Sequence, residues 1–338
     1  MKRFPVIALT LLSLSCVPLV GQDIHFSQFD GALLNISPAY TGVFEGEYRF
    51  SAIYRTQWQA VPVGYSTFNM NAEAALKPLF LKRDKLGLGV SFYNDKAGDA
   101  RYGITQFYAS GSYILYPKAK PELLMSFGVN LGLNRVGFDL TKMTFDAQYD
   151  GVQLVPGAYN GEQFTQTNAG YFDMNLGALL QYTFTETKKL SFGFGLHHIT
   201  TPKISYQGND LSQLDFKYSN LISYTSKISY RTHLTTEALF SAQGKNLELV
   251  PQLSLKYMLN EDYDQAISGG LCYRAKDAII LRMGYHYKLF HSGIAYDINV
   301  SQFTAATNRR GAFEIFINQT ISSSKPYASR RRICPVFM

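Results

Sequence analysis

The amino-acid sequence predicts an all-β protein, a transmembrane antiparallel β-barrel of about 14 strands with an N-terminal lead-in or plug segment and a short C-terminal periplasmic tail. Apolar and polar residues alternate with a period of two through most of the chain, which is typical of strands. Aromatic residues make up 14% of the chain and charged residues only 17%, a profile that favours strands with aromatic girdles. No run of about 18 apolar residues follows the N-terminal segment, which excludes helical membrane spans there.

The clearest alternation lies in residues 291–321, which we interpret as two strands joined by a turn. Ile294 and Tyr296 lie on one face of the first strand and Asp297 on the other, and Glu314 lies on the polar face of the second strand. A soluble sandwich would turn the polar face to water, whereas a membrane barrel turns the apolar face to lipid and the polar face to the lumen. This hairpin fits both architectures.

Fourteen segments of the chain show this alternation. They are residues 47–58, 65–76, 84–95, 102–115, 121–136, 169–184, 187–201, 218–231, 233–243, 246–259, 264–274, 277–287, 291–302 and 311–321. Most exceed the roughly 10 residues that a tilted strand needs to cross a bilayer.

The lengths of the connections decide between the two architectures. The long connections, residues 137–168 and 202–217, both follow odd-numbered strands, and the connections after even-numbered strands are short. Outer-membrane barrels have short periplasmic turns and longer outer loops. We therefore expect a multi-pass protein of the bacterial cell outer membrane, with both ends of the mature chain in the periplasm.

The N-terminal segment has the features of an export signal. Lys2 and Arg3 precede an apolar stretch from Val6 to Val20, and a small residue, Gly21, comes before Gln22. The predicted organisation is a signal peptide in residues 1–21, a lead-in or plug in 22–46, the barrel in 47–321 and a basic periplasmic tail in 322–338.

Several charged residues are expected to face the lumen. They are Arg49, Arg55, Glu73, Lys227, Arg282, Asp297 and Glu314. They would form either a charged channel or a salt-bridged network that braces the lumen. We favour the network, because buried charges need partners.

No pattern in the sequence indicates an enzyme. His197 and His198 are adjacent, so we expect them on opposite faces of a strand, where they cannot converge on a metal ion. Nucleophile-elbow and His-Glu metal spacings do not occur. Gly87 and Gly193 each begin a Gly-X-Gly pair without a following helix, which favours strand packing beside large aromatic residues over phosphate binding. We expect no catalytic residues, cofactor or metal; the enzymatic alternative is an outer-membrane lipase.

The expected periplasmic side is basic, within a chain of formal net charge +7. The basic residues there are Lys77, Lys82, Arg83, Lys118, Lys120, Lys188, Lys189, Lys325, Arg330, Arg331 and Arg332. They would contact either an acidic protein partner or the anionic headgroups of the outer-membrane lipid. Nucleic acid is not an expected partner of an exported chain.

Short motifs lie near both ends of the mature chain. The first part carries Asp23 to Phe29 (DIHFSQF), Pro38 to Gly42 (PAYTG) and Tyr54 to Trp58 (YRTQW), and the last part carries Tyr296 to Ser301 (YDINVS) and Cys334 to Phe337 (CPVF). With these motifs the sequence resembles the PorP/SprF family of type IX secretion system outer-membrane proteins.

This resemblance implies an outer-membrane barrel that serves type IX secretion or gliding motility. The implied partners are periplasmic ring and motor components, a peptidoglycan-binding partner, and the C-terminal domain of a secreted cargo protein. No catalytic residues are implied.

We therefore predict a non-enzymatic outer-membrane component that supports secretion or surface anchoring of cargo proteins and docks to periplasmic machinery. The alternative is an outer-membrane channel for small solutes. The candidate interaction residues are His25, Phe26, Ser27 and Gln28 in the lead-in, and Arg330, Arg331, Arg332, Cys334, Pro335 and Phe337 in the tail.

Overall fold

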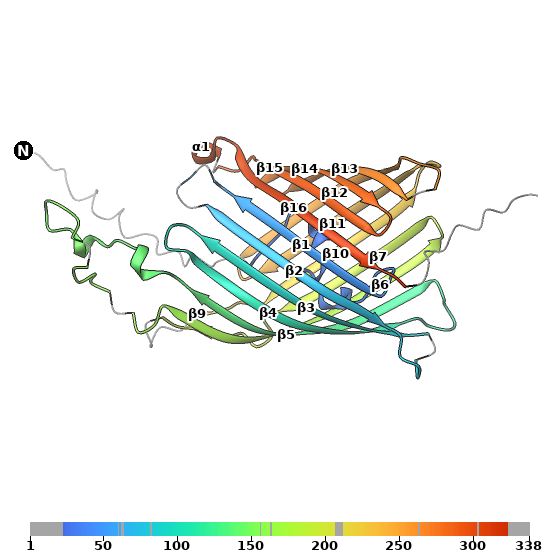
Figure 1. The fold of residues 1–338 in the computed structure, drawn as a ribbon, viewed down its shortest axis with the longest axis horizontal. Coiled ribbons are helices and arrows are strands. Elements are labelled where there is room, and N and C mark those ends of the chain that lie inside the picture. Colours follow the sequence, from blue (N-terminus) through green and yellow to red (C-terminus); the bar gives the residue numbers. More distant parts are fainter. Residues whose placement is uncertain are drawn as a thin grey trace, which may run out of the picture.

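In the computed structural model, fourteen antiparallel strands close into one barrel (Figure 1). The structure describes residues 23–59, 61, 64–81, 83–155, 157–162, 164–206, 212–262, 264–302 and 304–323. The predicted signal peptide, 1–21, and the tail from residue 324 onward lie outside this part of the chain. The predicted fold class, a closed barrel of 14 strands, is confirmed.

The barrel strands follow one another around the wall in chain order, and the last pairs with the first. They are β1 (Tyr48–Gln57), β2 (Tyr65–Leu76), β3 (Lys85–Ala97), β4 (Tyr102–Leu115), β5 (Leu123–Gly137), β6 (Asn168–Thr185), β7 (Lys188–His197), β10 (Lys217–Lys227), β11 (Thr232–Gln243), β12 (Asn246–Met258), β13 (Gln265–Arg274), β14 (Ala278–Tyr287), β15 (Phe290–Asn299) and β16 (Arg310–Ile321). Each coincides with a predicted segment. The largest differences are in β7, which was expected to reach residue 201 and ends at His197, and in β10, which was expected to reach residue 231 and ends at Lys227.

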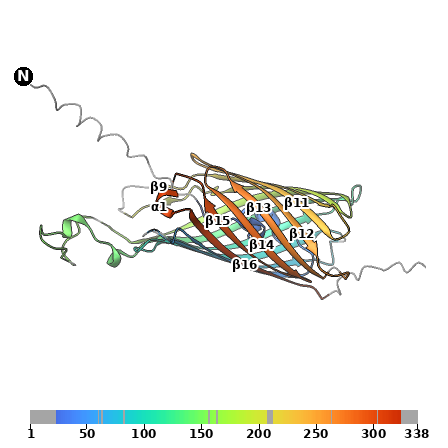
Figure 2. The ribbon, with the colours of Figure 1, turned by 90° about the horizontal axis from the view of Figure 1, so that it is seen from above.

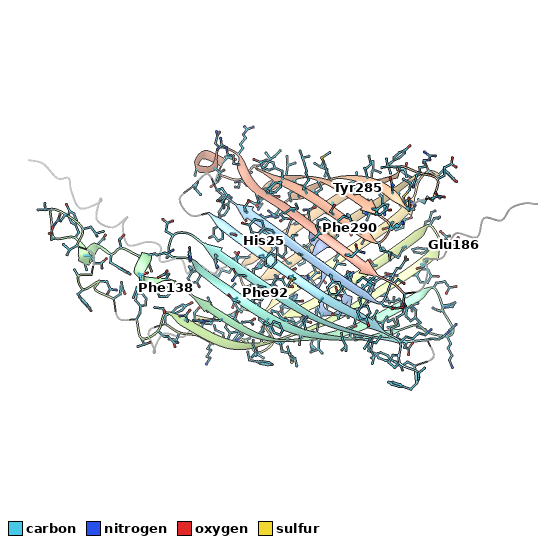
Figure 3. The ribbon with its side chains drawn as sticks, in the orientation of Figure 1. His25, Phe92, Phe138, Glu186, Tyr285 and Phe290 are labelled. Carbon is cyan, nitrogen blue, oxygen red and sulfur yellow. The ribbon has the colours of Figure 1, made fainter. Side chains whose placement is uncertain are left out.

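The two faces of the wall follow the predicted alternation. In β1, Tyr48 and Phe50 are exposed on the outside, whereas Arg49 and Arg55 are buried on the inside. Side chains such as Tyr285 cover the outer surface (Figure 3). Apolar side chains outside and polar side chains inside are the arrangement of a barrel in lipid.

The connections divide the barrel into two ends. One, called here the long-loop end, carries residues 138–167 and 198–216, and the former project well beyond the wall (Figures 1 and 2). The opposite end, called the short-turn end, carries the turns that follow even-numbered strands. The predicted placement of both long loops at one end is confirmed.

Both long loops contain short elements, and a third connection at this end holds a helical turn. These elements are η4 (Leu140–Lys142), η5 (Asp146–Gln148), the two-stranded sheet of β8 (Lys203–Ile204) and β9 (Ser212–Gln213), and α1 (Thr304–Thr307). No helix among the described residues is long and apolar enough to cross a membrane.

Residues 23–46, called here the lumen segment, run through the inside of the barrel. They include η1 (Phe29–Gly31), η2 (Leu33–Asn35) and η3 (Pro38–Tyr40). The segment starts at the long-loop end, where Asp23 contacts His198, and reaches the short-turn end, where β1 begins. The described part of the chain thus starts and finishes at opposite ends of the barrel, because the lumen segment crosses the barrel before β1. This differs from the expectation that both ends of the mature chain lie on the same side.

An apolar core lies between the lumen segment and the wall. Phe29, Leu34 and Ile36 from the segment belong to one buried cluster with wall residues that include Leu221 and Ile280. Burial of large apolar side chains is worth about 1.5–3 kcal/mol each. The lumen segment is therefore held by a hydrophobic core as well as by polar contacts.

Candidate functional site

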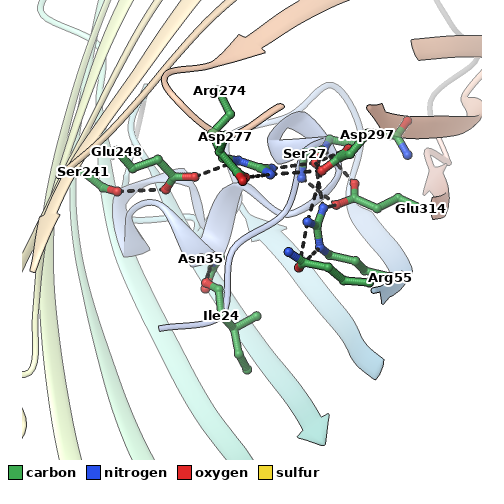
Figure 4. A network of polar contacts seen from close by, with 12 residues as sticks. Ile24, Ser27, Asn35, Arg55, Ser241, Glu248, Arg274, Asp277, Asp297 and Glu314 are labelled. Atoms are coloured by element: carbon green, nitrogen blue, oxygen red, sulfur yellow. Dashed lines mark hydrogen bonds and ion pairs between the residues drawn. The ribbon is translucent and has the colours of Figure 1, made fainter. Parts of the chain in front are cut away.

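Ser27 lies at the centre of a buried cluster of charged side chains that fixes the lumen segment to the wall (Figure 4). Its hydroxyl donates to the carboxylate of Asp297, whose oxygens are 2.8 and 2.9 Å away. The same oxygen accepts from Arg55 and Arg274, each at 2.7 Å. The Ser27 backbone N–H donates to Glu314 at 2.6 Å. Four strands thus meet the lumen segment at one residue.

The charges of this cluster are paired with one another. Arg55 contacts Asp297 at 3.1 Å and Glu314 at 2.5 Å, and Arg274 contacts Asp297 at 3.0 Å and Glu248 at 3.1 Å. Breaking a buried pair by removing one partner is strongly destabilising, because the other charge stays buried without compensation. These contacts form the salt-bridged network that the sequence favoured over a charged channel.

His198 fixes the start of the lumen segment at the long-loop end. Its Nε2 lies 2.6 Å from Asp23 and its Nδ1 lies 2.9 Å from Asp173. Burial lowers the pKa of His198, but the two carboxylates outweigh burial and raise the pKa to about 9. The imidazole is therefore protonated at neutral pH and bridges the segment and β6.

The expected orientation of the two histidines was wrong. His197 and His198 are both buried, and the His197 ring lies 3.0 Å from the backbone oxygen of Ile36. The strand ends at His197 and His198 has a φ of 59°, so the strict alternation of a strand stops there. Among the described residues, no group of three or more His, Cys, Asp and Glu side chains is arranged to hold a metal ion.

A third ionic contact fixes the segment nearer the short-turn end. Glu73 accepts the backbone N–H of Gly42 at 3.1 Å and pairs with Arg49, with nitrogen-to-oxygen distances of 2.7 to 2.9 Å. The Arg49 guanidinium also lies over the ring of Phe44, 4.5 Å from its centroid. The lumen segment is thus fastened near both of its ends.

Inward-facing glycines leave room for residues 36–42. A Cβ atom added to any of them would lie far inside van der Waals contact with the segment. The distances are 2.2 Å from Gly87 to the Thr41 oxygen, 2.3 Å from Gly128 to the Pro38 oxygen, 2.2 Å from Gly177 to Ser37 Oγ, 2.3 Å from Gly193 to Tyr40 Oη and 2.0 Å from Gly195 to the Ile36 oxygen. Gly193 does meet an aromatic ring, as the sequence suggested, but the common function of these glycines is close approach of the lumen segment.

The four predicted interaction residues of the lead-in all lie inside the barrel. Phe26 packs in a buried cluster with Ile53 and Phe316, and Gln28 donates its backbone N–H to Glu314 at 2.9 Å. His25 also lies within the barrel (Figure 3). The predicted interaction residues of the tail, Arg330, Arg331, Arg332, Cys334, Pro335 and Phe337, lie outside the described residues.

Among the charged members of the site, Asp173, Glu248 and Arg274 were not singled out from the sequence. Arg274 lies on the same face of β13 as Cys272, so the alternation that placed Arg282 in the lumen also applies to it. Asp23 was named only as the first residue of a motif, because it lies in a segment without regular periodicity.

The two long loops contact each other outside the barrel. Phe138 packs edge-on against Phe164 and Tyr206, with ring centroids 5.1 and 5.2 Å apart. The backbone N–H of Thr165 donates to Tyr206 at 3.0 Å, and the Gln166 side chain donates to a backbone oxygen of the other loop. Residues 138–167 and 198–206 are called here the loop platform.

The loop platform exposes apolar side chains. Tyr149, Val152 and Tyr159 are 56%, 86% and 71% exposed. Clustered exposed apolar and aromatic side chains are typical of surfaces that bind other proteins.

Comparison with known proteins supports the fold. A family model described as "Type IX secretion system membrane protein PorP/SprF" matches residues 20–318. A search of curated proteins found no relative of this chain. The Ralstonia pickettii toluene transporter TbuX is similar with a TM-score of 0.51 and 11% identity, over 86% of this chain and 94% of that chain. The CymD monoaromatic hydrocarbon channel is similar with a TM-score of 0.50 and 9% identity, over 90% and 95%. At such identities the likeness shows a shared barrel fold alone.

Proposed function

The chain belongs to the PorP/SprF family of type IX secretion system membrane proteins, and from this membership we propose that it is a plugged, non-enzymatic outer-membrane anchor. In this proposal the long-loop end faces outward and holds secreted cargo. The short-turn end faces the periplasm and docks to the secretion machinery.

The filled lumen is the observation that supports an anchor. The lumen segment is buried, paired with the wall near both ends and fitted against wall glycines. A barrel filled in this way has no path for a folded cargo protein. The surfaces left for binding proteins are its two ends.

The cargo surface that we propose is the loop platform. Its projecting part carries Tyr149, Val152 and Tyr159 with little burial. Large aromatic and aliphatic side chains supply much of the energy of protein interfaces. The proposed partner is the C-terminal domain of a secreted protein.

The proposed periplasmic surface is basic. Lys118 and Lys120 lie exposed on a turn of the short-turn end, and Lys188 lies exposed at the start of β7. The tail that follows β16 adds Arg330 to Arg332. The charge favours an acidic partner among the ring, motor or peptidoglycan-binding components. Attraction to anionic lipid headgroups is the competing explanation.

Affinity purification from gently solubilised outer membranes tests both surfaces. The tagged protein should recover a large secreted protein together with periplasmic components. Removing residues 145–160 should lose only the secreted protein, and truncation after residue 324 should lose only the periplasmic components. Unchanged recovery by both truncated proteins would refute the proposal.

The second candidate function is a channel for small solutes. A cavity of about 320 Å³ lies between the lumen segment and the wall, and the two similar structures are those of a toluene transporter and a monoaromatic hydrocarbon channel. If the protein is an anchor, the purified protein in lipid vesicles should show neither solute uptake nor stable ion conductance. Solute uptake or stable ion conductance would support the channel.

A further inference from the structure

A space inside the barrel lies beside the lumen segment, away from the Ser27 cluster. It has a volume of about 320 Å³, with Gln28, Tyr40 and Arg282 deep inside it and Lys189 and Lys256 on the side of the short turns. This volume is at the lower limit of small-molecule pockets. Lys189 is exposed whereas Gln28 is buried, so the cavity extends from solvent at the short-turn end to the lumen segment.

Three side chains in the cavity have hydrogen-bonding atoms without a partner in the described part of the chain. They are Nε2 of Gln28, Oη of Tyr40, and Nε and Nη1 of Arg282. These residues are only 1%, 6% and 9% exposed. Buried polar groups are nearly always hydrogen-bonded, and leaving one unsatisfied destabilises the folded protein. All three side chains offer donors to the same space, which therefore fits a ligand rich in acceptors.

The charge of the lining restricts the ligand further. Arg282, Lys189 and Lys256 face the cavity together with the carboxylates of Asp30 and Glu237. Asp30 is paired with Arg282 through Nη2, and Glu237 accepts from Gln252 at 2.7 Å. The cationic side chains outnumber the carboxylates in this lining, which favours an anionic group. A multiply charged phosphate would also meet the two carboxylates, so a group with a single charge fits better.

Two histidines complete the wall on the short-turn side. His286 and His291 stack with ring centroids 3.8 Å apart, and His286 contacts the Ser268 hydroxyl at 3.1 Å. Both rings line the cavity. They give it flat walls beside the polar groups, which suits a short, planar acid.

We propose that this cavity binds a small group that carries one carboxylate and further acceptors, presented from the short-turn end. Arg282 anchors the carboxylate, Gln28 and Tyr40 donate from the lumen segment, and Lys189 and Lys256 attract the anion at the entrance. The carboxylate belongs either to a free small acid or to the C-terminus of a peptide. Because wall and lumen segment both contribute, an occupied cavity also holds the segment more tightly. The proposal does not depend on the role in secretion.

Isothermal titration of the full-length purified protein in detergent tests the site. The probes are lactate for a free acid, N-acetylglycylglycine for a peptide end, and the matching C-terminal amide as the uncharged control. We expect saturable binding of at least one acid and none of the amide. Binding of lactate points to a free acid, and binding of the peptide alone points to a peptide end.

Variants locate the binding in the cavity. Arg282→Gln should weaken binding by about tenfold or more, as expected for a charged hydrogen bond. Because that change also removes the pair with Asp30, Tyr40→Phe and Lys256→Gln are tested beside it, and each should weaken binding several-fold. Lys288→Gln, which removes an exposed charge from a turn at the same end, is the matched control and should leave binding unchanged.

Three results would overturn the proposal. They are equal binding of acid and amide, no binding of either acid, and acid binding that Tyr40→Phe and Lys256→Gln leave unchanged. The second result would mean that water alone satisfies the buried donors. Loss of cargo recovery in the purification experiment would not affect this inference, so the two proposals fail separately.

Discussion

Arg55 of β1 and Glu314 of β16 are direct cross-strand neighbours at the seam where the barrel closes, with Nη1 and Oε1 2.5 Å apart. Both side chains are almost completely buried. The same carboxylate accepts the backbone N–H groups of Ser27 and Gln28. Glu314 therefore stabilises both the closure of the barrel and the position of the lumen segment inside it.

Glu314→Gln should loosen both the seam and the lumen segment. The change leaves the Arg55 guanidinium buried with less compensating charge, which costs about 3–5 kcal/mol for a broken buried pair. The measurement is the urea concentration at which half of the protein is unfolded. The folded fraction is followed by the heat-modifiable mobility of the barrel on a gel. Glu261→Gln, which removes the exposed pair with Arg231 at 3.7 Å, is the control and should cost less than about 1 kcal/mol. Equal midpoints for both variants would contradict the expectation.

Gly195→Ala should displace the lumen segment without opening the strand ladder. The added Cβ would lie 2.0 Å from the Ile36 oxygen, and the strands are held by backbone hydrogen bonds that the methyl group does not touch. We expect a new ion conductance in planar bilayers and faster protease cleavage within residues 23–46. Gly111→Ala, where the added atom meets nothing within 4 Å, should resemble the unchanged protein. If the Gly195→Ala variant shows no new ion conductance and no faster cleavage, the segment can shift to accommodate the methyl group.

Seating of the lumen segment should weaken as the pH rises toward 9. The pKa of His198 is raised from 6.5 to about 9, so its stabilising charge is fully present below about pH 6.5 and is lost as the pH rises through about 9. The pKa of Asp23 is lowered, even though burial opposes this, because His198 and Lys217 favour its charged form. The stabilisation that the Asp23 carboxylate gives to the lumen segment is lost at acid pH instead, where the carboxylate becomes protonated.

Protease cleavage of residues 23–46, followed between about pH 6 and 10, measures this effect. Cleavage should accelerate at the alkaline side in the unchanged protein. His198→Gln should be cleaved faster at neutral pH and should lack the alkaline rise assigned to this residue. Parallel pH profiles for the two proteins would rule out His198 as the titrating group.

Phe138→Ala should separate the two loops of the loop platform. It removes the ring contacts with Phe164 and Tyr206, each worth about 0.5–1.5 kcal/mol. Hydrogen exchange should accelerate in residues 138–167 and 198–206 while the strands keep their protection, and recovery of the secreted partner should fall. Phe127→Ala, which removes an exposed ring from the outer wall, serves as the control. Unchanged exchange in 198–206 would show that the loops are ordered independently.

Much of the barrel follows from the sequence because its signals are local. A pleated strand sends successive side chains to opposite faces, so each segment's own alternation identifies the strand, its lipid face and its lumen face. Asp297 and Glu314 were placed in the lumen by this argument, and the long loops by the parity of the turns. The end of β7 was misplaced because His198 leaves the strand through a positive φ, which alternation does not encode.

The sequence by itself determined the number of strands, which residues face lipid and the end that carries the long loops, since these depend on short-range periodicity. Only the tertiary structure decided what fills the lumen. Ser27 meets Asp297 and Glu314 across most of the chain length, and Gly195 meets Ile36, because closing fourteen strands brings distant positions around one segment. Such contacts arise from the geometry of closure, and no local pattern in residues 23–46 records them.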